Sequence, residues 1–139
     1  MRVALDTNIV VSGLLWKAAP RHVLDAAREQ HITLYTSGVL LEKLAEVLSR
    51  EHLASAIAAN QASPAFLMQR YAMLAQLVIP ASIGRVVAKD IDDDAIIACA
   101  LGADAALIVS GDAHPLNLKR YQDISIVSAT TALALIAKP

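Results

Sequence analysis

Residues 2–8 read Arg-Val-Ala-Leu-Asp-Thr-Asn, and this stretch decides the interpretation of the fold. Residues 2–5 have the pattern of a short buried strand, and the three residues that follow favour turns and helix caps. Asp6 is therefore predicted to end the first strand. The most apolar run of the chain, residues 105–109, leads in the same way into Ser-Gly-Asp, so Asp112 is predicted to end a second strand.

Short strands alternate with helices along the rest of the chain, and Ser37 and Ser128 are predicted helix caps. This alternation predicts an α/β fold with three layers, α/β/α, around a central, mainly parallel sheet. Ligands bind such sheets at the carboxyl ends of the strands, where Asp6 and Asp112 are expected. The other predicted strands are 32–35, 77–79 and 124–127, and the predicted helices are 9–16, one beginning near Pro20, one from Ser37 through Leu48, 51–59, 64–73, one ending near Gly102, and one after Ser128.

Composition limits the possible function classes. The chain has 139 residues, of which 56% are hydrophobic and 18% charged, so we expect a single domain over residues 1–139. The net charge of -1 excludes a polybasic nucleic-acid binder, and no apolar run approaches the roughly 20 residues of a membrane-spanning helix. The N-terminus shows no export signal. The single cysteine, Cys99, has apolar neighbours and is predicted to be a small core residue. A soluble, cytoplasmic protein is expected.

An acidic run at residues 90–94 precedes the helix that ends near Gly102. Asp93 shares a helical stripe with Ile96 and Ile97, so it is predicted to face the sheet edge. Asp90 and Asp92 are assigned to the turn before the helix, and Asp94 lies further round the stripe. For these three residues, complementation of the helix dipole is the favoured interpretation.

Asp6, Asp93 and Asp112 together indicate a functional site and not only helix-dipole complementation. Carboxylates about 4 Å apart repel by about 4 kcal/mol per pair at an effective dielectric constant of about 20, so a positive group must compensate them. Protonation, a basic side chain or a bound cation would do so, and oxygen ligands without nearby cysteine or paired histidine select Mg²⁺ or Mn²⁺. Carboxylate-held Mg²⁺ usually acts on phosphates, which indicates a phosphoester substrate.

The ordered set of these motifs resembles a known family. The motifs resemble a PIN domain, and more narrowly the toxin branch related to VapC, and the resemblance extends over nearly the whole chain. It implies a Mg²⁺- or Mn²⁺-dependent ribonuclease in which an activated water attacks an RNA phosphodiester. The residues that carry it are Asp6-Thr7-Asn8, Asp93-Asp94-Ala95-Ile96-Ile97-Ala98-Cys99-Ala100-Leu101 and Val109-Ser110-Gly111-Asp112, with further similarity at residues 34–37 and 121–127.

The resemblance also implies roles and partners. Asp6 and Asp93 would be the principal metal ligands, and Asp112 would support the metal directly or through water. Asn8 and Ser110 would orient carboxylates by hydrogen bonds. Whether Asp93 or Asp94 is the ligand depends on the register; Asp93 is preferred because it aligns the Ala100-Leu101 pair with that of the family. A small antitoxin and a homodimer are implied as well.

Position 43 departs from the family pattern. Family members usually carry a glutamate immediately before the leucine that matches Leu44, and this chain has Lys43 there, with Glu42 and Glu46 nearby. On a helical wheel Lys43 flanks the apolar stripe, whereas both glutamates point more nearly to solvent. Glu42 is included among the predicted catalytic residues, with Glu46 as the other candidate for completing the site. Lys43 would alternatively neutralise the aspartates and weaken metal binding.

Two other function classes remain open. One is a catalytically impaired PIN-like module that binds RNA or protein, which Lys43 favours. The other is an aspartyl-phosphate phosphatase, because Asp6 lies at a strand end where such nucleophiles are found. A haloacid-dehalogenase-like phosphatase would carry a second acid two residues later, where this chain has Asn8. RNA cleavage that requires a metal would identify the nuclease. An acid-labile phosphate on the protein would identify the aspartyl phosphatase.

Overall fold

The computed structural model describes residues 1–82, 91–111 and 120–137, with only the backbone of residues 91–93. Its described strands form a six-stranded sheet in the order β3-β2-β1-β4-β6-β5. Every neighbouring pair is parallel except β5 and β6, which are antiparallel. The strands are β1 (Arg2–Leu5), β2 (Thr33–Thr36), β3 (Ala75–Leu77), β4 (Leu107–Val109), β5 (Arg120–Tyr121) and β6 (Ile124–Val127).

The helices begin where the sequence supplies caps. Ser37, Ser63 and Ser128 each accept a backbone N–H in the first turn of the helix that follows, and prolines lie in the first turns of α2 and α5. Within the described residues no helix has the length and hydropathy needed to cross a bilayer. The helices are α1 (Thr7–Leu15), α2 (Ala19–Arg28), α3 (Gly38–Leu48), α4 (Ala54–Ala59) after a short 3₁₀ turn (Glu51–Leu53), α5 (Pro64–Leu74), α6 (Ile91–Gly102) and α8 (Ala129–Ile136).

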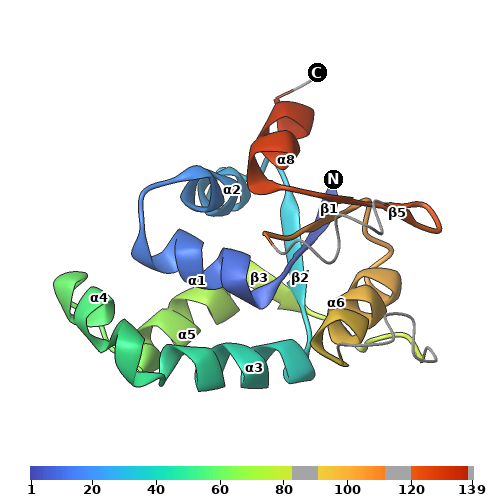
Figure 1. Ribbon diagram of the computed structural model, residues 1–139. Helices are drawn as coiled ribbons and strands as arrows, with labels where there is room; N and C mark the ends of the chain where they lie inside the picture. Colours follow the sequence, from blue (N-terminus) through green and yellow to red (C-terminus); the bar gives the residue numbers. More distant parts are fainter. Residues whose placement is uncertain (83–90, 112–119, 138–139) are drawn as a thin grey trace.

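Alternation along the strands divides the core between the two faces of the sheet. Val3 and Leu5 belong to one buried cluster, and Ala4 between them belongs to the other. The first cluster includes side chains of α1, α2, α3, α5 and α8, and the second those of α6. Figure 1 shows α2 and α6 on opposite sides of the central strands. The predicted three-layer α/β/α fold with a mainly parallel sheet is confirmed.

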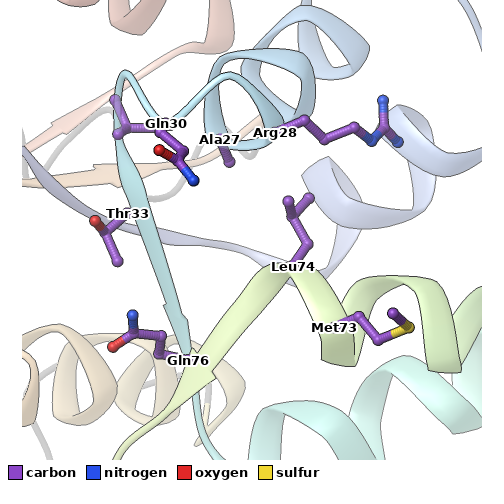
Figure 2. Close-up of a pocket in the computed structure, with 8 residues that line it drawn as sticks. Ala27, Arg28, Gln30, Thr33, Met73, Leu74 and Gln76 are labelled. Atoms are coloured by element: carbon purple, nitrogen blue, oxygen red, sulfur yellow. The ribbon is translucent and has the colours of Figure 1, made fainter.

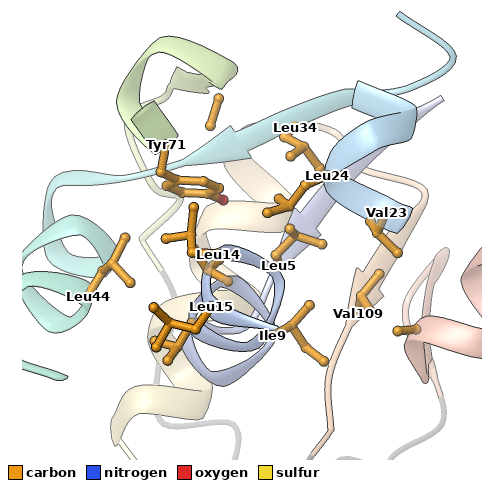
Figure 3. Close-up of a cluster of buried hydrophobic side chains, with 14 of the residues drawn as sticks. Leu5, Ile9, Leu14, Leu15, Val23, Leu24, Leu34, Leu44, Tyr71 and Val109 are labelled. Atoms are coloured by element: carbon orange, nitrogen blue, oxygen red, sulfur yellow. The ribbon is translucent and has the colours of Figure 1, made fainter. Parts of the chain in front are cut away.

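The larger cluster packs around the junction between β1 and α1. Figure 3 shows Leu5 of β1, Ile9 of α1 and Val109 of β4 among the buried side chains on one side of the sheet. Because the chain turns into α1 immediately after β1, the residue at this turn, Asp6, lies above the sheet edge next to a close-packed core. The core therefore holds the strand end that carries the candidate site.

Several predicted boundaries differ from the structure. The third strand is β3 at Ala75–Leu77, two residues earlier than predicted, because Ala75 closes α5 with its N–H and already pairs with β2. The two-residue strand β5 was not predicted. Asp92 lies inside α6 and not in the preceding turn, because the helix begins at Ile91. The first helix starts at Thr7, two residues early, directly after its cap.

Candidate active site

Asp6 is held in one orientation at the carboxyl end of β1. Its side chain is 9% exposed, and Oδ1 accepts the backbone N–H of Thr7 at 2.8 Å. Its backbone carbonyl accepts the N–H groups of Ile9 and Val10, which begin α1. A carboxylate at a helix N-terminus also interacts favourably with the positive end of the helix dipole. The site is therefore organised around an oriented carboxylate that is nearly buried.

Ser110 fixes the second oxygen of this carboxylate. Its hydroxyl donates to Asp6 Oδ2 at 3.0 Å, and the serine is 5% exposed. The sheet register explains the contact: Leu5 pairs with Val109, so the next residues of β1 and β4 meet just beyond the strand ends. The backbone N–H of Asp6 donates to the Val109 carbonyl at 2.9 Å and continues the same ladder. The role that the resemblance implies for Ser110, orienting a carboxylate, stays a prediction, and this hydrogen bond is its geometric basis.

Asp94 lies near the carboxyl end of β2. Its half-buried side chain lines a cavity of about 280 Å³ together with Ser37, which follows β2 directly, and with Pro80. Ala95 and Ala98 of α6 line the same cavity. Sequence reasoning assigned Ser37 as a helix cap in a segment that resembles the family, and did not include it among the site residues. Its position directly after a strand, as Asp6 follows β1, was the signal that it borders the site.

The second turn of α3 presents a lysine and not an acid. The Lys43 side chain is 34% exposed and lies on the stripe between Leu40 and Val47, which are both buried. Glu42 is exposed, as the helical wheel predicted. Glu46 is also exposed and receives two hydrogen bonds from Arg50, at 2.8 and 3.1 Å, as well as an ion-pair contact with Lys43 at 3.9 Å.

The remaining predicted site residues are only partly placed. Asn8 is exposed in the first turn of α1. Asp93 lies in the first turn of α6, but its side chain is outside the described part, and Asp112 is outside it altogether. Among the side chains that the structure does describe, no three His, Cys, Asp or Glu residues gather as a metal site. The predicted ligand set therefore stays a prediction, apart from the placement of Asp6.

Cys99 does not contribute a nucleophile to this region. It is fully buried in α6, and burial raises the pKa of its thiol to about 11. Burial likewise raises the pKa of the Tyr71 hydroxyl, with a smaller contribution from Cys99. Both groups are neutral at physiological pH, and the prediction that Cys99 is a core residue is confirmed.

A larger cavity of about 600 Å³ lies away from the carboxyl ends of the strands. Figure 2 shows Thr33 at the amino end of β2, Arg28 at the end of α2, and Met73 and Leu74 at the end of α5 around it. Two helices thus end at this cavity, and Arg28 lies where a cation complements the negative end of a helix dipole. This cavity is separate from the edge that carries Asp6.

Comparison with known proteins identifies the family. The PIN-domain family model matches residues 2–114, which include Asp6, Asp93 and Asp112. The chain belongs to the PIN-domain family. The family resemblance drawn from the sequence motifs is therefore confirmed. No curated protein matches the sequence significantly.

A solved structure shares the fold of this PIN domain. It is the crystal structure of VapBC2 from Rickettsia felis bound to a DNA fragment from their promoter. The two chains superpose with a TM-score of 0.59 over 91% of this chain and 97% of the other, at 16% sequence identity. At this identity the likeness shows the fold.

Proposed function

We propose that this PIN domain is a Mg²⁺- or Mn²⁺-dependent endoribonuclease that hydrolyses RNA phosphodiester bonds. We also propose that residues 1–139 form one domain, because β1 pairs with β4, and β4 with β6 near the end of the chain. The observation that carries the proposal is the Asp6 carboxylate, which Thr7 and Ser110 fix at the carboxyl edge of the sheet. Ligands bind parallel sheets at this edge.

The described donors fit a hard divalent cation. Hydrogen bonds from Thr7 and Ser110 fix the directions of the two Asp6 oxygens, and a carboxylate offers acceptor oxygens only. Together with Asp93 or Asp94 and Asp112, the site would offer oxygen ligands only, which suits Mg²⁺ or Mn²⁺. The bound ion would neutralise phosphate charge and lower the pKa of a water molecule.

The residues of the chain have separate roles in this proposal. Asp6 binds the cation, and Ser110 is a positioning residue that keeps the Asp6 carboxylate in one orientation. Partners that orient metal ligands in this way are worth about 10- to 100-fold in metal affinity. Glu42 stays the predicted fourth acid, but its exposure on α3 means that it reaches the site only if the helix rotates or shifts. Asn8, which is exposed in the first turn of α1, keeps its proposed role of orienting a carboxylate by a hydrogen bond.

A toxin role in a toxin–antitoxin pair is part of the proposal. It is supported by the PIN-family membership and by the structural likeness to VapBC2, a protein whose solved structure includes promoter DNA. A small cognate antitoxin would then be the protein partner, and the cytoplasm the site of action. Induced expression is expected to arrest bacterial growth, and Asp6→Asn is expected to abolish the arrest without lowering expression.

Lys43 favours a second candidate function, a PIN-like module that binds RNA or protein without cleaving it. The Lys43 side chain is 34% exposed and contacts Glu46, which also accepts hydrogen bonds from Arg50. A cation near carboxylates competes with a metal ion for them. If this second candidate is correct, RNA is bound equally well with and without Mn²⁺ and is not cleaved.

The test is cleavage of end-labelled single-stranded RNA with Mg²⁺, Mn²⁺ or a chelator. The nuclease proposal predicts cleavage that requires the metal and is lost in one of the two variants Asp93→Asn and Asp94→Asn, which also decides the ligand. Asp104→Asn, an exposed acid on the loop after α6, is the matched control. Uncleaved RNA under all conditions would contradict the proposal, and an acid-labile phosphate on Asp6 would instead identify a phosphatase.

A further inference from the structure

The cavity beside Asp94 lies one strand away from the Asp6 carboxylate. Ala4 of β1 pairs with Tyr35 of β2, and the same parallel register carried past the strand ends places Ser37 beside Asp6. Neighbouring strands are about 4.8 Å apart, so a molecule held at Asp6 extends readily into the cavity. Figure 1 shows the start of α3 next to α6. We call this space of about 280 Å³ the Asp94 cavity, and the residues that line it include Ser37, Val39, Pro80, Asp94, Ala95 and Ala98.

The walls of the Asp94 cavity are small and mostly apolar. Pro80, Ala95 and Ala98 contribute short side chains, and Val39, which lines the cavity as well, is 55% exposed. The volume lies just below the range of about 300–1,000 Å³ that is typical of pockets for drug-sized ligands. The cavity therefore has room for a single ring system, and its walls are of the kind against which the faces of a nucleobase pack.

Two polar side chains give the cavity a hydrogen-bond donor and an acceptor. The Ser37 side chain is 1% exposed, and its hydroxyl oxygen accepts the N–H of Leu40 at 3.3 Å. Its own O–H makes no hydrogen bond to any residue that the structure describes, so this buried group can donate to a ligand. The half-buried Asp94 carboxylate offers acceptor oxygens only. A ligand that satisfies both residues carries an acceptor beside its donors.

This combination argues against three other kinds of occupant. A phosphate or a carboxylate would be repelled by Asp94. A basic side chain of a partner protein would pair with Asp94 but would leave the Ser37 hydroxyl without an acceptor. An apolar side chain would satisfy neither group and would remove both from water, which costs free energy. The bases of single-stranded RNA present donors and acceptors together on their Watson–Crick edges.

Guanine matches the cavity better than the other three bases. An ionised carboxylate can accept two parallel N–H bonds. The Watson–Crick edge of guanine places two donors, N1–H and N2–H, side by side and next to the acceptor O6. Adenine, cytosine and uracil each carry a single donor group on this edge, beside acceptor atoms that Asp94 would repel.

We propose that the Asp94 cavity binds a guanine base of single-stranded RNA. The Asp94 carboxylate accepts N1–H and N2–H of the base, and the Ser37 hydroxyl donates to O6. The inference rests on the proposed function for its substrate, and it names the base that the site selects. It also assigns Asp94 to base recognition, so that Asp93 is the predicted metal ligand on α6.

The test is the affinity of the full chain for short labelled RNAs, measured by fluorescence anisotropy with a chelator present so that no cleavage occurs. The RNAs are an oligouridine and the same strand with guanosine, adenosine or cytidine at one central position. The wild-type chain is expected to bind the guanosine RNA about 5- to 150-fold more tightly than the other three, which is the discrimination typical of a bidentate contact.

Two variants examine the cavity itself. Asp94→Asn is expected to remove the guanosine preference because it exchanges an acceptor for a donor, and Ala95→Leu because leucine fills the space that the base would occupy. Asp104→Asn and Ala56→Leu are the matched controls and are expected to keep the preference, since Asp104 is an exposed acid after α6 and Ala56 a half-buried alanine of α4.

The result separates this inference from the nuclease proposal. Equal affinity of the wild-type chain for the four RNAs, or a guanosine preference that persists in both variants, would overturn the base-binding proposal. Binding of an arginine-rich peptide in place of RNA would overturn it as well and would assign the cavity to a protein partner. A guanosine preference without metal-dependent cleavage would contradict the nuclease proposal alone, and cleavage without any base preference would contradict this inference alone.

Discussion

Replacing Ser110 by alanine tests whether the candidate site depends on an oriented carboxylate. The substitution removes the hydrogen bond from the Ser110 hydroxyl to Asp6 Oδ2, which joins residues that are 5% and 9% exposed. A hydrogen bond to a charged group contributes about 1.5–3 kcal/mol, more than one between neutral groups. Asp6 keeps the N–H of Thr7, so the carboxylate becomes less constrained but stays in place.

Two measurements on the same variant follow from this geometry. Urea denaturation in the presence of a chelator is expected to show a loss of about 1.5–3 kcal/mol in the free energy of unfolding. Calorimetry is expected to show Mn²⁺ affinity reduced by about 10- to 100-fold, because Ser110 orients the ligand without binding the ion. Ser125→Ala is the control, since Ser125 is a half-buried serine of β6 within the same sheet.

The loss of stability and the loss of Mn²⁺ affinity are expected in the same variant. A stability change within about 0.5 kcal/mol, which is typical of a surface substitution, would mean that the hydrogen bond contributes little in solution. Unchanged Mn²⁺ affinity alongside lost stability would mean that Asp6 is a helix cap and not a metal ligand. Either result would refute the assignment of Ser110 as a positioning residue.

Three further predictions concern α3 and α6. Lys43→Glu is expected to raise Mn²⁺ affinity, measured by calorimetry, because it exchanges a competing cation for a carboxylate on the same stripe; unchanged affinity would place Lys43 outside the site. Gly102→Ala is expected to destabilise the chain by about 1–3 kcal/mol in urea denaturation, because its Cβ would collide with the Ile79 carbonyl; a gain in stability would mean that helix propensity prevails. Cys99 is neutral in the folded chain up to a pKa of about 11 but ionises from about 9.0 when unfolded, so stability falls as pH rises through this window. The loss between pH 8 and pH 10 is about 1 kcal/mol, and Cys99→Ala should remove this part of the pH dependence; an equal slope in both proteins would contradict the assignment.

Sequence reasoning was most successful where local chemistry determines the structure. The strand before Asp6, the cap at Ser37 and the proline at the start of α5 each depend on residues within one turn of the chain. The family resemblance implied that Ser110 orients a carboxylate, and the sheet explains why Ser110 lies next to Asp6. Both residues follow apolar strands, and the ends of parallel strands meet at one edge.

Other features depend on contacts that a single sequence does not reveal. The boundary of β3 follows from the pairing of Ala75 with Leu34, and β5 exists through an antiparallel pairing of only two residues. The cavity beside Asp94 requires the end of β2 and the first turns of α6 to approach each other. The close approach of Gly102 to the Ile79 carbonyl requires α6 to pack against the segment after β3. Each feature depends on contacts between segments that are distant in the sequence, so local propensity did not predict it.

The most direct test of the central claim compares the wild-type chain with Asp6→Asn. Asparagine keeps the shape of the side chain and its ability to cap α1, so the variant is expected to fold. Calorimetric titration with Mn²⁺ and cleavage of single-stranded RNA are measured on the same two preparations. We predict that the wild-type chain binds Mn²⁺ and cleaves RNA and that the variant does neither. Equal Mn²⁺ binding or equal cleavage by the variant would contradict the assignment of Asp6 as the central ligand.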